Sequence, residues 1–526
     1  MTTKRLMIAA ILVIVLVSIF SYISALKLNF LYHDDYVIIK ETYMNPCDYY
    51  LGNWVGGRGG GGLYRPFIIS TINLDRHIWG LSPFGYHLSN IAFHAANGAL
   101  MFILAYLLLG QMAVAFCSAI LFSVMPVNAE AVNWVCCRCD LLATMFFLSA
   151  VIFFHLYIKG KKMTSYILFL AAFIVSLLSK EIAIMLPFVI FAYLFFYENS
   201  GIKQKLMRLV PLFAILAVYF IIRYISLGTF IGGYKIGFVG GLINSVLGGI
   251  RTIQLTFLPF TQENLFMYFI LLPLLAAGTL YAFVVFYRAN GVDPFMTFSL
   301  IFTIAGLLPV LYILPIGFNF QCSRFWYLPS IGISWMISYY LLGKHALKER
   351  MKKIGLVIFI AFVIYNLYFL VIINRDWQKA SDLTREIKRQ AVAIAARYPK
   401  GSSIYFWETP DNYQGCYVGF PCLKPPFIDT GRNIRGYIDN DMWYMSYMDV
   451  SKNRDIKGAA HYVYNEKKGR YVKCDLQDVL RNDYQRLNDP RRSQMIFKRF
   501  LMTIGTGDSM ARRLIRVLNA RKRTGK

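Results

Sequence analysis

The sequence predicts a polytopic α-helical membrane protein with a smaller α+β domain at its C-terminal side. Of its 526 residues, 57% are hydrophobic and only 16% are charged, which is too apolar for a soluble enzyme of this length. Apolar stretches of about 18–25 residues recur as far as Ile373, and each is long enough to cross a hydrocarbon core roughly 30 Å thick. After Ile373 the sequence becomes more polar, which indicates a separate domain.

Eleven apolar segments are predicted to be transmembrane helices. They are roughly residues 7–29, 88–109, 111–127, 141–158, 164–180, 182–198, 209–227, 266–287, 295–316, 329–344 and 354–373. The predicted domains are therefore a membrane domain, residues 1–375, and a soluble domain, residues 376–526.

The charges between these segments predict an orientation. Basic residues gather in alternate connections, at Lys4 and Arg5, Lys159–Lys162, Lys203–Arg208, Arg288 and Lys344–Lys353. The positive-inside rule assigns these connections to the cytoplasm. The N-terminus is then cytoplasmic, whereas Asp34, Asp35 and the C-terminal domain lie on the outer side.

Two long connections fall on the outer side. Residues 30–87 contain the glycine run Gly56–Gly62, which lacks the Gly-Lys-Ser/Thr ending of a phosphate-binding loop and is interpreted as a flexible connector. Residues 228–265 contain an amphipathic stretch around Leu242–Leu258, which is expected to lie in the membrane interface. A twelfth span is the alternative for that stretch.

The C-terminal domain has mixed signals. Leu383–Tyr398 has a helical pattern, and Ser403–Trp407 is typical of a short strand followed by a turn. Cys416 and Cys422 flank a short loop and are candidates for a disulfide on the outer side, with Cys474 as the competing partner. The net charge of +27 favours membrane lipids with anionic headgroups as partners over nucleic acid.

The residues that can carry chemistry are charged groups at the outer ends of the spans. Such groups are costly unless they pair or line a wet site, so each is a functional candidate. Asp34 and Asp35 form an adjacent pair just after the first span. Structural pairing is the alternative for Lys180 with Glu181, and for Arg138 with Asp140. His94 is interpreted as a packed, hydrogen-bonded histidine.

A carboxylate pair that faces several cations suits group transfer from an anionic lipid. The carboxylate removes a proton from an acceptor hydroxyl, and the cations stabilise charge on a departing phosphate. A transporter or lipid flippase would also use buried charges, but more often near the middle of the bilayer on broken, repeated helices.

Four ordered segments carry a family resemblance. They are Leu63–Leu100 (LYRPFIISTINLDRHIWGLSPFGYHLSNIAFHAANGAL), Met125–Phe147 (MPVNAEAVNWVCCRCDLLATMFF), Ser179–Pro187 (SKEIAIMLP) and Ser323–Gly332 (SRFWYLPSIG). Together with the Asp pair, they resemble the integral-membrane GT-C glycosyltransferases related to the transmembrane, tetratricopeptide-repeat-containing O-mannosyltransferases and their bacterial relatives. Met125 and Ser323 depart from the family pattern, which has His and Glu there, and the repeat array is absent.

The resemblance implies roles for these residues. It makes Asp34 the catalytic base and Asp35 its helper, and it implies a sugar donor linked to a polyprenyl or dolichyl phosphate. The candidates for binding the donor phosphate are Arg138, Lys180 and Arg324, because a phosphate needs fixed cations. The supporting or substrate-binding residues are Arg65, His87, Glu130, Asp140 and Glu181, with Arg65 and His87 expected at the mouth of the cavity.

No metal is required by this scheme, although Asp34, Asp35 and Glu130 could supply oxygen ligands to a divalent ion. The resulting hypothesis is a GT-C glycosyltransferase that transfers a sugar, with inversion, to a hydroxyl of a protein, glycan or lipid. A bacterial cytoplasmic membrane is the expected location. The alternatives are a polymerase or ligase that uses a polyprenyl-diphosphate oligosaccharide, and a transporter or flippase.

Overall fold

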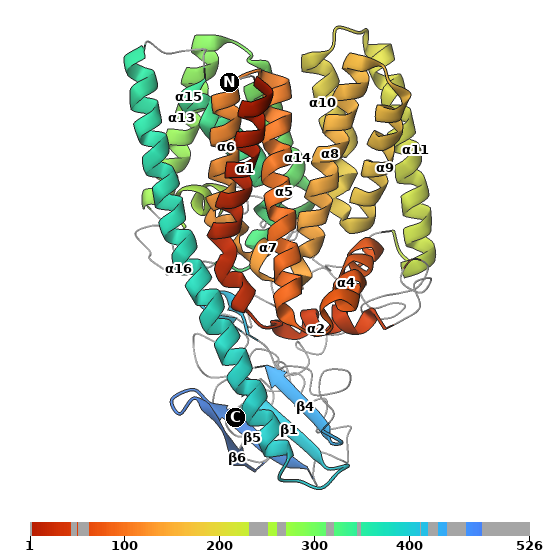
Figure 1. The fold of residues 1–526 in the computed structure, drawn as a ribbon, viewed down its shortest axis with the longest axis vertical. Coiled ribbons are helices and arrows are strands. Elements are labelled where there is room, and N and C mark those ends of the chain that lie inside the picture. The colour runs from red at the N-terminus through yellow and green to blue at the C-terminus, as the bar shows by residue number, and fades with distance from the viewer. Residues whose placement is uncertain are drawn as a thin grey trace, which may run out of the picture.

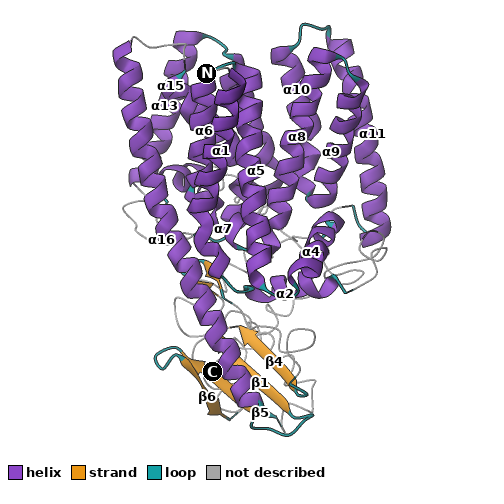
Figure 2. Cartoon of the chain, in the orientation of Figure 1, coloured by secondary structure: helices purple, strands orange, loops and turns teal. Residues whose placement is uncertain are grey.

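A computed structural model describes residues 3–43, 50, 63–230, 251–259, 270–311, 320–343, 349–410, 412–418, 430–438 and 459–475. A bundle of long helices forms most of this structure, and a small β-sheet lies beyond one end of the bundle (Figures 1 and 2). The predicted glycine run, most of the second long connection and Cys422 lie outside the described residues.

The bundle is built from apolar helices. They are α1 (Thr3–Tyr22), α5 (Pro83–Leu109), α6 (Met112–Val124), α8 (Arg138–Gly160), α9 (Met163–Ser179), α10 (Leu186–Tyr197), α11 (Ile202–Leu227), α13 (Leu272–Asn290), α14 (Pro294–Leu311), α15 (Tyr327–Leu342) and α16 (Glu349–Ala395). Several of them have a proline in the first turn, where the N–H that proline lacks would have no partner within the helix.

A helix overlaps each of the eleven predicted spans. Among the described residues, five helices are long and apolar enough to cross a membrane, and a sixth is obtained if α6 and the residues up to Asn133, bent by 54°, form one span. Three further apolar helices are shorter. The chain is therefore a multi-pass helical membrane protein, while the number of eleven spans stays a prediction.

The first long connection is largely helical. It holds α2 (Tyr32–Glu41) and α4 (Pro66–Trp79), which lie at the end of the bundle nearest the sheet (Figure 1). Ile39, Ile69 and Ile72 pack with Tyr86 in a small hydrophobic core of their own. This core fixes the segment that carries Asp34 and Asp35 against the bundle.

Short helices connect the long ones at this same end. They are η1 (Ile23–Lys27), η2 (Pro126–Asn128), α7 (Ala129–Asn133), η3 (Val135–Cys137), η4 (Glu181–Met185) and η6 (Ser323–Trp326). Four of them bear or directly adjoin a residue singled out in the sequence: α7 bears Glu130, η3 precedes Arg138, η4 follows Lys180 and η6 bears Arg324.

Helix α16 joins the bundle to the C-terminal sheet. It has 47 residues, which corresponds to roughly 70 Å at 1.5 Å per residue. The sequence from Leu356 to Tyr398 contains neither glycine nor proline, so nothing in it interrupts the helix where the apolar segment ends. The predicted boundary at residue 375 thus falls inside a continuous helix, and the predicted helix Leu383–Tyr398 is its last part.

The sheet is mixed and has the strand order β4-β1-β5-β6. Strand β1 (Ser403–Thr409) pairs in parallel with β4 (Asn433–Ile438) and with β5 (Ala460–Asn465), and β5 pairs antiparallel with β6 (Arg470–Cys474). The predicted strand at Ser403–Trp407 is confirmed as β1. A separate hairpin of β2 (Asn412–Tyr413) and β3 (Cys416–Tyr417) contacts α16.

Candidate active site

Asp34 and Asp35 have different surroundings although they are adjacent. Asp35 is fully buried, and both of its carboxylate oxygens accept backbone hydrogen bonds: Oδ2 from the Leu31 N–H at 2.7 Å and Oδ1 from the Cys136 N–H at 2.8 Å. It therefore ties the start of α2 to η3. Asp34 remains partly exposed, so of the two carboxylates it is the one that a substrate can reach.

Burial raises the pKa of the Asp35 carboxyl well above its usual value. The two backbone hydrogen bonds and the charge of Arg138 act in the opposite direction, and the charge of Asp34 adds to the increase. Asp35 is thus held in place by one backbone N–H on each of its oxygens, and its burial separates it from a substrate.

Four buried or partly buried ion pairs surround this region. They are Arg65–Glu181, Arg138–Asp75, Lys180–Asp140 and Arg324–Glu130. The sequence suggested structural pairs of Lys180 with Glu181 and of Arg138 with Asp140. In the structure Lys180 instead pairs with Asp140, and Arg138 pairs with Asp75. Residues one or two apart on a helical segment point in different directions, so each of these side chains meets a partner from another part of the chain.

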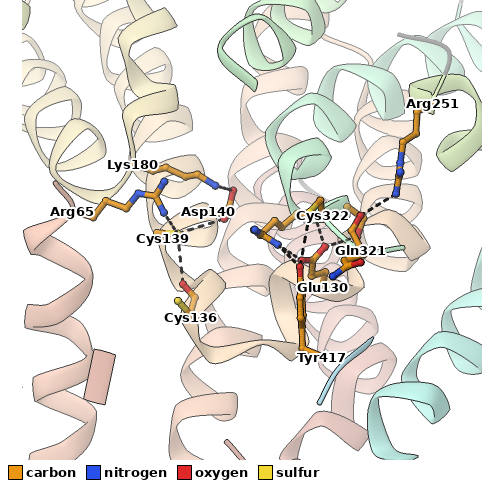
Figure 3. Close-up of polar contacts among 12 residues, drawn as sticks. Arg65, Glu130, Cys136, Cys139, Asp140, Lys180, Arg251, Gln321, Cys322 and Tyr417 are labelled. Atoms are coloured by element: carbon orange, nitrogen blue, oxygen red, sulfur yellow. Dashed lines mark hydrogen bonds and ion pairs between the residues drawn. The ribbon is translucent and has the colours of Figure 1, made fainter. Parts of the chain in front are cut away.

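The first group of contacts lies between α4, α8 and the turn after α9 (Figure 3). Arg65 donates to both oxygens of Glu181, at 2.9 Å and 2.5 Å, and its Nη1 lies 3.5 Å from the sulfur of Cys139. Lys180 pairs with Asp140 Oδ1, and the Cys139 thiol donates to Asp140 Oδ2 at 3.5 Å. The two ion pairs therefore meet at Cys139.

The second group lies around Glu130, which is 1% exposed (Figure 3). Glu130 pairs with the Arg324 guanidinium and also accepts the Arg324 backbone N–H at 3.1 Å and the Ser323 hydroxyl at 3.3 Å. Arg324 lies over the ring of Trp134, 5.2 Å from its centroid. Ser323, which departs from the family pattern, is thus a hydrogen-bond donor to the same carboxylate.

Arg138 and His87 are more enclosed than the sequence suggested. Arg138 is 0% exposed; it pairs with Asp75 at 2.6 Å and donates to Asn90 Oδ1 and to the Tyr86 carbonyl, each at 2.9 Å. His87 is also 0% exposed, with Nε2 3.3 Å from the Asn29 carbonyl, so the structure does not put it at a mouth. His94 is packed and hydrogen-bonded to the Tyr327 hydroxyl at 2.8 Å, as predicted.

Two residues at this end were not assigned a role from the sequence. Tyr417 comes from the C-terminal hairpin and contacts Arg324, and Arg223 is buried near the end of α11. No sequence pattern marks Tyr417, because its contact depends on the path of α16. Arg223 does have a signal, since it is a charged residue inside an apolar segment.

The described residues include no group of three or more His, Cys, Asp or Glu side chains placed to hold a metal ion. Asp35 and Glu130, two of the three candidate ligands, are already engaged by backbone N–H groups and by Arg324 respectively.

No family model matches the chain. Its relatives among curated proteins include Protein O-mannosyl-transferase Tmtc1 of Drosophila melanogaster, 29% identical over 31% of this chain and 20% of that protein. TMTC2 of Homo sapiens is 30% identical over 25% of this chain and 17% of that protein, and F38B6.6 of Caenorhabditis elegans is 30% identical over 33% and 26%. The chain thus spans only about a fifth of these relatives.

Two solved structures were also found to be similar. One is ArnT from Cupriavidus metallidurans bound to undecaprenyl phosphate, with a TM-score of 0.47, 12% identity and coverage of 88% of this chain and 93% of that chain. The other is the Archaeoglobus fulgidus oligosaccharyltransferase tethered with an acceptor peptide, with a TM-score of 0.46, 12% identity and coverage of 81% and 64%. By sequence, part of this chain is similar to the TMTC protein O-mannosyl-transferases.

Proposed function

We propose that this protein is an integral-membrane glycosyltransferase of the GT-C fold, which moves a sugar from a polyprenyl-phosphate donor to an acceptor hydroxyl. The observation that carries the proposal is that the two adjacent aspartates have different environments. Asp35 has both oxygens engaged by backbone N–H groups, whereas Asp34 is partly exposed. The sequence similarity to O-mannosyl-transferases makes sugar transfer the first chemistry to test.

In the proposed reaction, Asp34 is the base. Its carboxylate takes the proton of the acceptor hydroxyl while the acceptor oxygen forms a bond to the anomeric carbon of the sugar. The bond between that carbon and the phosphate oxygen breaks, and the polyprenyl phosphate leaves with the electron pair. Because the attack comes from the face opposite the phosphate, the anomeric configuration inverts. The scheme requires no metal.

The neighbouring residues have supporting roles in this proposal. Lys180 and Arg324 are the cations that assist the departing phosphate, and Asp140 and Glu130 hold them in position. Arg138 is also a sequence-predicted phosphate-binding residue. Because it is completely buried and bound to Asp75 and Asn90, it acts in this proposal by holding those residues in position and not by touching the phosphate. Arg65 with Glu181 fixes the start of α4, and His87 anchors the segment after α1 through Asn29.

The proposal includes the predicted topology. Eleven spans and the basic connections would place the N-terminus in the cytoplasm, with Asp34 and the C-terminal domain outside, in a bacterial cytoplasmic membrane. A mannosyl donor and a serine or threonine hydroxyl of a protein are the first substrates to test, because the curated relatives are named protein O-mannosyl-transferases. Glycan and lipid hydroxyls remain alternative acceptors.

The variant Asp34→Asn tests this function. We expect purified membranes that contain it to lose sugar transfer by roughly a hundredfold or more, since general-base catalysis contributes about 10²–10⁴-fold. The matched control is Asp382→Asn, which removes an exposed carboxylate that pairs with Arg385 of the same helix, α16. Undiminished transfer by Asp34→Asn would show that Asp34 is not the base. Transfer from a diphosphate-linked oligosaccharide alone would favour the polymerase or ligase alternative.

A further inference from the structure

Arg223 is a buried cation that has no acidic partner within the described part of the chain. It lies on α11, one turn before the helix ends at Leu227, and is 4% exposed. Its Nη1 donates a hydrogen bond of 3.2 Å to the Tyr219 hydroxyl, and its Nε has no hydrogen-bond partner among the described residues. The guanidinium is therefore removed from water, and no carboxylate of the described residues balances its charge.

The other cations considered for the donor phosphate differ from Arg223 in this respect. Arg138, Lys180 and Arg324 each form an ion pair with a carboxylate, and so does Arg65. A phosphate that contacts any of them would share the cation with that carboxylate. At Arg223 a phosphate would instead supply the missing negative charge and an acceptor for Nε, which removes the cost of an isolated buried ion.

The end of a helix does not compensate this charge by itself. The C-terminal carbonyl groups of α11 are equivalent to only about half of an elementary negative charge, and this effect falls off within the last turn. Balancing the full positive charge of Arg223 therefore requires an anion that the described residues do not supply.

Arg223 is close to the candidate active site. Tyr219, whose hydroxyl accepts the hydrogen bond from Arg223, contacts the ring of Tyr64 with 6.0 Å between the ring centroids. Tyr64 directly precedes Arg65, and the Tyr219 hydroxyl also interacts electrostatically with Arg65 and Glu181. A group bound at Arg223 would therefore lie beside the first group of ion pairs.

The outer face of α11 is suited to a lipid chain. Val218, Ile221 and Ile225 are 55–62% exposed and are spaced by three and four residues, so they form one apolar stripe along the helix. At 3.6 residues per turn, Arg223 lies on the opposite side of α11 from this stripe. A lipid whose hydrocarbon follows the stripe would therefore have to bend around the end of the helix near Leu227 to bring its phosphate to Arg223.

We infer that Arg223, with Tyr219, binds the phosphate of a membrane lipid, namely the polyprenyl monophosphate of the sugar donor. The identity of the lipid rests on the proposed function, whereas the binding of a phosphate rests on the burial of Arg223 and on the hydrogen-bonding capacity that its Nε keeps among the described residues. The phosphate of an ordinary bilayer phospholipid has the same chemistry, and the experiment separates the two sources.

The test is a binding measurement on the full chain in detergent, with undecaprenyl phosphate as the probe and dissociation followed by native mass spectrometry. We expect Arg223→Gln to weaken binding at least tenfold. Arg208→Gln is the matched control: Arg208 is on the same helix, about 22 Å along its axis, and is paired with Glu198. It should bind as the unmodified protein does. Undecaprenol, which lacks the phosphate, should bind weakly to all three proteins.

Wild-type affinity of Arg223→Gln for undecaprenyl phosphate would overturn the inference. If phosphatidylglycerol displaces undecaprenyl phosphate equally well, the ligand is not specifically the sugar donor. If only inorganic phosphate displaces it, the ligand of Arg223 is not a lipid. If Arg223→Gln does not fold, a polyprenyl phosphate with a photoreactive group beside its phosphate should label residues 219–227 of the unmodified protein. Labelling confined to the neighbourhood of Arg324 would contradict the site. Because these readouts measure binding, they stand even if sugar transfer is not detected.

Discussion

The Nη1 atom of Arg324 donates a hydrogen bond of 3.2 Å to the hydroxyl of Tyr417. Tyr417 belongs to the β2–β3 hairpin, and its ring lies against Trp134 with 4.3 Å between centroids. Trp134 lies between α7, which bears Glu130, and η3, whose Cys136 N–H binds Asp35. The C-terminal part of the chain is thus in direct contact with the candidate active site.

Tyr417→Phe should lower activity while the protein stays folded, because the ring contact with Trp134 is kept and only the hydroxyl is lost. A hydrogen bond to a charged group contributes about 1.5–3 kcal/mol, so we expect kcat/KM for the donor to fall by roughly tenfold. Tyr413→Phe in the same hairpin is the control. An equal loss in both variants would show that the hairpin, and not the contact with Arg324, is responsible.

Asp35→Asn should destabilise the protein more than Asp34→Asn does. Asparagine can accept only one of the two backbone hydrogen bonds from Leu31 and Cys136, and its NH₂ group would face the other donor. Leaving a buried donor unsatisfied costs about 1–3 kcal/mol, which thermal unfolding in detergent should detect. An unchanged unfolding temperature together with abolished transfer would instead make Asp35 a participant in the chemistry.

The pH dependence of stability should report on Asp35 as well. Its folded-state pKa is raised, so the protonated form is favoured in the folded protein. The stabilisation from this carboxyl is then fully present below its unfolded pKa, about 4, and is lost as the pH rises through the folded value. The difference in the free energy of unfolding between the unmodified protein and Asp35→Asn should therefore decrease as the pH rises. A difference that increases with pH would mean that the two backbone hydrogen bonds lower the pKa of Asp35 by more than burial raises it.

The sequence could predict the helices but not the partners of the charged residues. Long apolar runs determine where helices form, so a helix overlaps every predicted span. The ion pairs join residues that are 116 positions apart in Arg65–Glu181 and 194 apart in Arg324–Glu130, and no local pattern encodes such contacts. The contact of Tyr417 with Arg324 could not be predicted either, because it depends on α16 continuing through residue 375 into the polar region.

Glu130→Gln should be costly because it leaves Arg324 without its counter-charge. Removing one partner of a buried pair costs about 3–5 kcal/mol, and we expect roughly 2–3 kcal/mol here because the Arg324 side chain is 14% exposed. The double variant Glu130→Gln with Arg324→Gln should recover part of this stability, although not the activity. Additive losses in the two single variants would show that the two side chains are not coupled.

Gly332→Ala should test the packing of α15 against α14. A Cβ atom on Gly332 would overlap Thr303 Oγ1 and lie 2.6 Å from the carbonyl oxygen of Ser299, and a backbone oxygen in a packed helix cannot move away. Overpacking of this kind costs about 1–3 kcal/mol, so the unfolding temperature should fall. Gly278→Ala on α13 is the control, because a Cβ there meets no atom within 4 Å and alanine favours the helix. A stabilised Gly332→Ala variant would mean that α14 and α15 are further apart than the structure has them.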